Sequence, residues 1–146
     1  MSNKRFWWSV LSVWIVMNVT NYFIHEVWLS SLYQQTAQFW RSAEAIQHWA
    51  WMMWVGSLVW SWAFVWIYSK GISTSNPWGQ AFRYAWGIIL LSQIPQWAMT
   101  WVVSPYPAEL VIKWAFVGAI QAMLCAYVMT WTFKPQLSWS TKTSNQ

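Results

Sequence analysis

Hydrophobic positions gather into four long segments that are separated by short polar stretches. Each segment reaches about 20 residues or more, the length at which an α-helix crosses the hydrocarbon core of a bilayer. Apolar and polar residues do not alternate with a period of two, so the pattern favours helices over a transmembrane barrel. The predicted spans cover residues 6–32, 47–68, 81–103 and 108–133.

Proline and its neighbours mark the connections between these segments. Asn76 followed by Pro77 is a helix-start signal and predicts the beginning of the third helix. Residues 104–107 hold two prolines and form a short turn, which predicts that the third and fourth helices are antiparallel neighbours. Pro95 lies inside the third segment and is expected to bend that helix.

The predicted fold class is all-α: a polytopic membrane protein with four transmembrane helices in an antiparallel bundle. One domain, residues 1–134, holds all four helices. Residues 135–146 are rich in Ser and Thr, and we predict that they form a disordered cytoplasmic tail.

Composition supports lipid as the solvent of this chain. Charged residues make up 8% of the sequence and hydrophobic residues 58%, whereas a soluble domain has about 25% charged residues. The expected partner is therefore the lipid bilayer. The net charge of +5 is spread over chain ends and connections, which is typical of orientation in a membrane and not of nucleic-acid binding.

Basic residues predict the orientation, because they are enriched in cytoplasmic connections. Six of the eight fall at the N-terminus, in or beside the second connection and near the C-terminus. Both termini are therefore predicted to be cytoplasmic, with a bacterial inner membrane as the location. The six are Lys4, Arg5, Lys70, Arg83, Lys134 and Lys142, and the other two are Arg41 and Lys113.

Tryptophan is the most unusual component, at 18 of 146 residues. Its ring favours the membrane interface, where the N–H group stays hydrated. We interpret most of these residues as apolar bulk and interfacial anchors. An aromatic ligand cage is the alternative.

Several polar residues fall at similar depths in three of the predicted helices, and we expect them to converge. We call this set the polar seam. It is either a set of interhelical hydrogen bonds that fixes the register or a cavity for a small ligand or ion that opens outward. Its residues are Asn18, Asn21, Tyr22, His25, Gln93, Gln96 and Gln121.

Charged residues beyond the seam are predicted to form an outer polar cap. A carboxylate near the end of a membrane helix needs a partner. Glu26 has Arg41 as its candidate partner, and Arg41 can also pair with Glu44 three residues later.

The chain carries little that points to catalysis. We find no nucleophile–base set, phosphate loop or paired intramembrane carboxylates, so no enzyme is expected. His25, His48 and Glu26 do not have the spacing of a metal site. Haem ligation by His25 lacks an attachment motif and a paired histidine. We therefore expect neither a metal nor a cofactor.

A series of short motifs runs from the end of the first predicted span into the connection after it. In order, they are Phe23-Ile24-His25-Glu26, Leu32-Tyr33, Thr36-Ala37 and Trp40-Arg41. This order resembles a group of small bacterial four-helix integral membrane proteins, and the resemblance implies an inner-membrane fold without implying an activity. The Trp content is also similar to that of tryptophan-rich sensory proteins that bind tetrapyrroles. Those proteins have five spans, whereas four are predicted here.

Two functions follow as expectations. The first is a non-enzymatic structural or accessory subunit of a membrane assembly, with other membrane subunits or further copies of itself as partners. The second is a small-ligand or proton-coupled transport or sensing protein that uses the seam. A ligand-sized cavity at Asn21, His25, Gln96 and Gln121 favours the second, and a filled seam favours the first.

Overall fold

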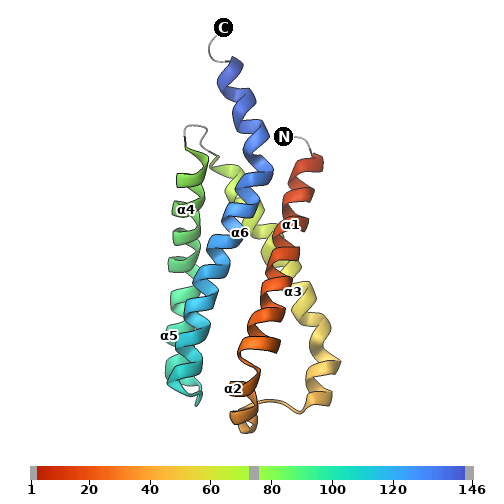
Figure 1. Ribbon diagram of the computed structural model, residues 1–146, viewed down its shortest axis with the longest axis vertical. Helices are drawn as coiled ribbons and strands as arrows, with labels where there is room; N and C mark the ends of the chain where they lie inside the picture. Colours follow the sequence, from red (N-terminus) through yellow and green to blue (C-terminus); the bar gives the residue numbers. More distant parts are fainter. Residues whose placement is uncertain (1–2, 73–75, 144–146) are drawn as a thin grey trace.

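The computed structural model describes residues 3–72 and 76–143, with side chains described for 4–72 and 76–133. These residues contain helices and no strand, so the all-α prediction is confirmed. Four helical rods lie side by side, each antiparallel to the next along the chain (Figure 1). The first rod comprises α1 (Asn3–Asn21), the π-helix η1 (Tyr22–Trp28) and α2 (Ser30–Gln35), and a 3-10 turn, η2 (Ala37–Phe39), leads to the second rod, α3 (Ala43–Lys70). The third rod comprises α4 (Pro77–Ile88), the π-helix η3 (Ile89–Gln93) and α5 (Ile94–Val103). The fourth rod is α6 (Ala108–Thr143).

The first and third rods each contain a π-helical segment, in which backbone hydrogen bonds reach five residues back. The Leu29 N–H donates to the Ile24 carbonyl at the end of η1, and the Ile94 N–H donates to the Ile89 carbonyl at the end of η3. Pro95 follows η3 directly and has no N–H to donate. The expected disturbance of the third helix is therefore present as a π-helical segment. No proline lies in the first rod, so the sequence has no comparable signal for η1.

Two helices of the described chain are long and apolar enough to cross a membrane, namely α3 and residues Ala108–Phe133 of α6. The core helix of a soluble protein can meet the same criterion. The other two predicted spans correspond to interrupted rods. The third is divided into α-helices of 12 and 10 residues, and the first changes to a π-helix after Asn21.

Helix bounds at the connections follow the sequence signals closely. The Asn76 side chain caps α4 by accepting a hydrogen bond from the Gly79 N–H at 2.8 Å, with Pro77 in the first turn, as predicted. At the other end of the chain, α6 continues to Thr143. Residues 135–143 of the predicted disordered tail therefore fall within a helix. Residues 144–146 lie outside the described residues.

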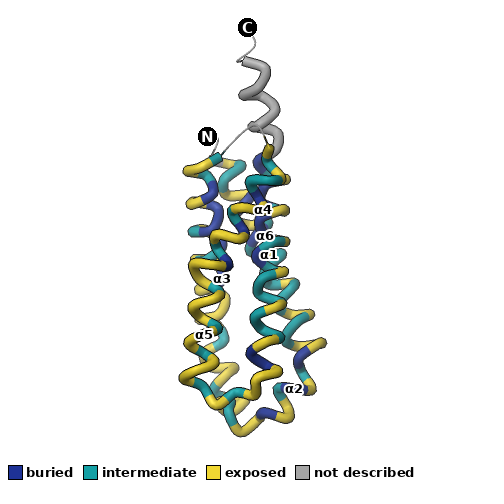
Figure 2. Tube along the Cα trace, turned by 90° about the vertical axis from the view of Figure 1, so that its left-hand side faces the viewer, coloured by how far each residue is buried: buried dark blue, intermediate teal, exposed yellow. Residues whose placement is uncertain are grey.

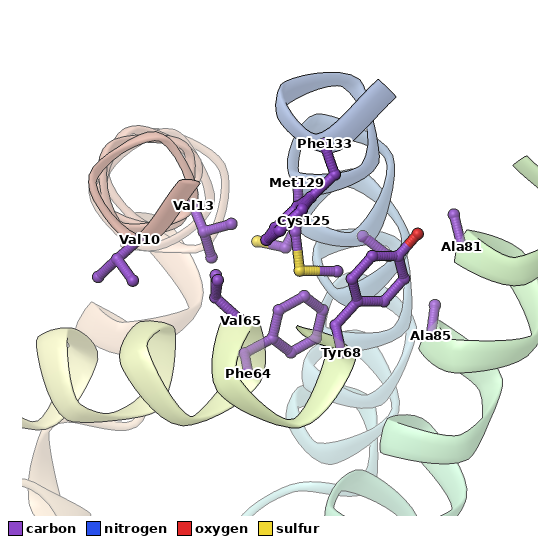
Figure 3. Packing of buried hydrophobic residues seen from close by; sticks show 11 residues of the cluster. Val10, Val13, Phe64, Val65, Tyr68, Ala81, Ala85, Cys125, Met129 and Phe133 are labelled. Carbon is purple, nitrogen blue, oxygen red and sulfur yellow. The ribbon is translucent and has the colours of Figure 1, made fainter. Parts of the chain in front are cut away.

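A hydrophobic core closes one end of the bundle, where α1 begins (Figure 3). All four rods contribute to it. Small side chains on α4 and α6 let those helices approach closely, as expected for helices that associate without a large hydrophobic driving force. Buried hydroxyls are paired: Thr130 donates to the Tyr68 hydroxyl at 3.0 Å. The core residues are Val10, Val13, Phe64, Val65, Tyr68, Ala81, Ala85, Cys125, Ala126, Met129 and Phe133.

The opposite half of the molecule is more open. In this half, most residues in the first half of α3 and most residues of α5 are exposed (Figure 2). Between Ala43 and Gly56, Ala45 and Ala50 alone are partly shielded. A smaller cluster around Leu29, Leu32 and Leu110 holds the end of the first rod against the start of α6.

Replacing Ala85 with Leu tests the close approach of α4 to the core. Ala85 is fully buried, and a larger side chain in such a site costs about 1–3 kcal/mol. We expect Ala85→Leu to lower the SDS concentration at which the protein unfolds in mixed micelles. The matched variant Ala98→Leu, at an exposed position of α5, is expected to unfold like the wild type. Equal unfolding of both variants would contradict this packing.

Candidate functional site

A cavity of about 460 Å³ lies between the first rod, the third rod and α6. We call it the polar cavity. Its volume falls within the range of small-molecule sites, about 300–1,000 Å³. No Asp, Glu, Lys or Arg is among its lining residues. The lining consists of Asn21, Ile24, His25, Gln93, Gln96, Trp97, Thr100, Ser104, Tyr106, Trp114, Val117, Gly118 and Gln121.

Both π-helical segments supply lining residues to this cavity. In η1, Ile24 and His25 line the cavity, and Asn21 lies directly before this segment at the end of α1. In η3 the last residue is Gln93, whose side chain points toward α6. An extra Cβ on Gly118 would lie 2.8 Å from the Gln93 side-chain oxygen. Glycine at that position therefore makes room for the amide.

Gln121 joins α6 to the first rod at the inner end of the cavity. Its side-chain amide nitrogen lies 2.7 Å from the Thr20 hydroxyl, 2.9 Å from the Asn21 side-chain oxygen and 3.1 Å from the Met17 carbonyl. Two N–H bonds can serve two of these three acceptors at once. Gln121 therefore has a structural role in addition to lining the cavity.

Gln93 and Gln96 of the third rod differ from Gln121. Within the described part of the chain, the side chains of Gln93 and Gln96 form no hydrogen bond with another residue. An amide offers both a donor and an acceptor. These two side chains are therefore available to a ligand.

A short hydrogen-bond chain closes the outer end. The Trp114 indole N–H, which can only donate, bonds the Tyr33 hydroxyl at 2.8 Å. The Tyr33 hydroxyl is also hydrogen-bonded to Nδ1 of His25. When the Tyr33 O–H is the donor, the proton of a neutral imidazole is on Nε2. Burial raises the pKa of the Tyr33 phenol, so the phenol remains protonated and can donate.

The structure brings five of the seven predicted seam residues together: Asn21, His25, Gln93, Gln96 and Gln121. Tyr22 is not among the lining residues and is 60% exposed. The α-helical spacing that placed it on the same face as His25 does not hold in a π-helix. Asn18 instead links α1 to α3, because its amide donates to the Trp14 carbonyl at 2.8 Å and to the Ser57 hydroxyl at 3.4 Å.

The predicted polar cap is not held together by ion pairs. In the described residues, the recorded salt bridge joins Lys113 to Glu109. Glu26 and Arg41 are exposed and both line a second cavity. Glu44 is also exposed, at the start of α3, and lines neither this cavity nor the polar one.

Sequence reasoning missed the aromatic part of the site. Trp97, Tyr106 and Trp114 line the polar cavity, and Tyr33 fixes the orientation of His25. Trp40 stacks on Tyr106 with ring centroids 5.2 Å apart. Among 18 tryptophans no local signal distinguishes these positions. Their proximity to Pro105–Pro107 and to the first connection is the one sequence feature that they share.

The arrangement of the polar cavity suits an uncharged molecule with both hydrogen-bond donors and acceptors. Free amides and hydroxyls line it, and aromatic rings provide apolar contact. No protein-family model, curated protein or solved structure matches the chain. Its function is therefore inferred from its own geometry.

Replacing Gln121 with Leu tests its structural role. Interhelical hydrogen bonds in lipid are worth about 1 kcal/mol, so Gln121→Leu should lower the free energy of unfolding by about that amount. SDS titration in mixed micelles measures the change. Gln96→Leu makes the same replacement where no internal hydrogen bond exists, and we expect wild-type stability from it. Equal stability of Gln121→Leu and the wild type would contradict the role of Gln121.

Proposed function

We propose that this chain is a non-enzymatic multi-pass protein of a bacterial inner membrane, in which all four rods cross the bilayer and the polar cavity binds a small uncharged molecule. The observation that carries the proposal is the cavity itself. It brings together Asn21, His25, Gln96 and Gln121 around a space of about 460 Å³.

Surface composition supports the bilayer setting. In α3 and in residues Ala108–Phe133 of α6, 22% of the most apolar 18-residue stretch is buried. The core helix of a soluble protein would be mostly buried. Large exposed patches of apolar side chains mark contact with lipid or a partner. Leu91, Val102 and Trp131 are at least 69% exposed. The excess of basic residues near the ends of the chain orients both termini toward the cytoplasm.

The π-helical segments support a binding role over pure packing. Such segments are rare and occur frequently at functional sites. A packed seam would leave no free amides, yet Gln93 and Gln96 have none of their hydrogen-bonding capacity used by described residues. The ligand is uncharged, because a charged ligand would lose its hydration without meeting an opposite charge in this lining.

An accessory subunit of a membrane assembly is the second candidate function. The exposed first half of α3 favours it, since all residues between Ala43 and Gly56 except Ala45 and Ala50 are exposed. Native mass spectrometry from mild detergent separates the two candidates, because it reports small-molecule adducts and subunit number together.

For the leading proposal, we expect the wild-type chain to retain a small non-covalent adduct in that measurement. Gln96→Leu should lower adduct occupancy by about fivefold, because a neutral hydrogen bond is worth about 1 kcal/mol. Gly118→Ala should also lower it by moving the Gln93 amide. The flexible end of Gln93 can shift, so the fold should be retained.

Two matched variants serve as controls. Gln47→Leu changes an exposed glutamine outside both cavities, and Gly56→Ala adds a methyl group where nothing lies within 4 Å. Both are expected to keep the adduct. Detection of the wild type without any adduct, or equal adduct occupancy in all five proteins, would refute ligand binding in the polar cavity.

A further inference from the structure

A second cavity, of about 820 Å³, lies between the outer end of the first rod, the first connection and the start of α3. We call it the apolar cavity. It shares His25 and Trp114 with the polar cavity, so these two side chains form a common wall. Its lining residues are His25, Glu26, Tyr33, Gln34, Ala37, Trp40, Arg41, Ser42, Ala43, Ile46, Met53 and Trp114.

The α3 side of this cavity is an apolar track that runs along the helix. Ala43, Ile46 and Met53 fall within about 80° of one another around α3, and the track is about 15 Å long at 1.5 Å per residue. Ile46 is 46% exposed and Met53 71% exposed. The cavity is therefore open along its side, toward the surface that faces lipid in the proposed bilayer setting.

The cavity has two charged lining residues, Arg41 and Glu26. Arg41 is just before α3, and Glu26 is near the end of the first predicted span. They line the same cavity without forming an ion pair with each other. A guanidinium group matches the geometry of a phosphate, and a carboxylate is a natural acceptor for an ammonium group.

These features together match an amphiphile that carries two opposite charges. An anionic lipid would satisfy Arg41 but would meet repulsion from Glu26. A small soluble ligand would leave the track toward Met53 unfilled. We propose that the apolar cavity binds one phospholipid with a zwitterionic amine headgroup, with its phosphate at Arg41, its ammonium at Glu26 and an acyl chain along Ala43, Ile46 and Met53.

The proposal rests on the bilayer setting proposed above, and the first measurement tests that setting separately. Membranes that contain the full chain are washed with alkaline carbonate. Release of the chain would refute the membrane setting and the lipid site together. Retention followed by a failure of lipid selectivity would refute the lipid site alone.

Lipid selectivity is measured on the full chain in mild detergent. Synthetic dioleoyl phosphatidylethanolamine or dioleoyl phosphatidylglycerol is titrated, and bound lipid is counted by native mass spectrometry. We expect one phosphatidylethanolamine to bind about fivefold more tightly than phosphatidylglycerol. Glu26→Gln should abolish this preference. Arg41→Gln should weaken the binding of both lipids by about tenfold, because charge-assisted hydrogen bonds are stronger than neutral ones.

Matched controls separate a site from general surface charge. Glu44→Gln and Arg83→Gln change exposed residues outside the cavity and should leave both affinities unchanged. Ile46→Trp should fill the track and weaken the binding of phosphatidylethanolamine. Ile67 is 45% exposed on the other half of α3, and Ile67→Trp should leave this binding unchanged.

Three results would overturn the proposal. One is equal binding of the two lipids by the wild type. Another is an effect of Glu44→Gln as large as that of Glu26→Gln. The third is a lipid-free dimer as the dominant species, which would assign this face to a second copy of the chain.

Discussion

Backbone hydrogen bonding in the two π-helical segments decides which side chains reach the centre of this molecule. In the bilayer proposed above, no water would satisfy a broken hydrogen bond, so an irregularity must keep its polar groups paired internally. A π-helical turn does so by reaching one residue further back. The turn also rotates every later residue relative to the face before it. Tyr22, three residues before His25, therefore does not line the polar cavity with it.

Packing differs between the two ends of the bundle, and the difference creates the space for both cavities. At the end where α1 begins, small residues such as Ala81 and Ala126 allow all four rods to close on one core. At the other end, bulky aromatic side chains keep the rods apart. Tyr33, Trp40, Tyr106 and Trp114 contact one another there. They join the first connection to the start of α6, and they lie at the boundary between the two cavities.

The polar residues consequently have different roles, although they look similar along the chain. Gln121 and Asn18 are occupied by hydrogen bonds that hold α1 to its neighbours. Gln93 and Gln96 lie at comparable depth but on the opposite wall of the cavity. His25 is held by Tyr33 and borders both cavities. Hydrogen bonds between helices and unpaired side-chain amides therefore occur together around the polar cavity.

The sequence by itself determined the helical class and the approximate positions of the four rods. These properties depend on apolar content, on local signals such as Asn76-Pro77 and on a constant rise along a helix. Tertiary structure decided the direction in which each side chain points. The π-helical turn in the first rod has no sequence signal, so Tyr22 could not be separated from His25. Glu26 and Arg41 line the same cavity only because α3 packs beside the first rod, which depends on contacts between distant segments.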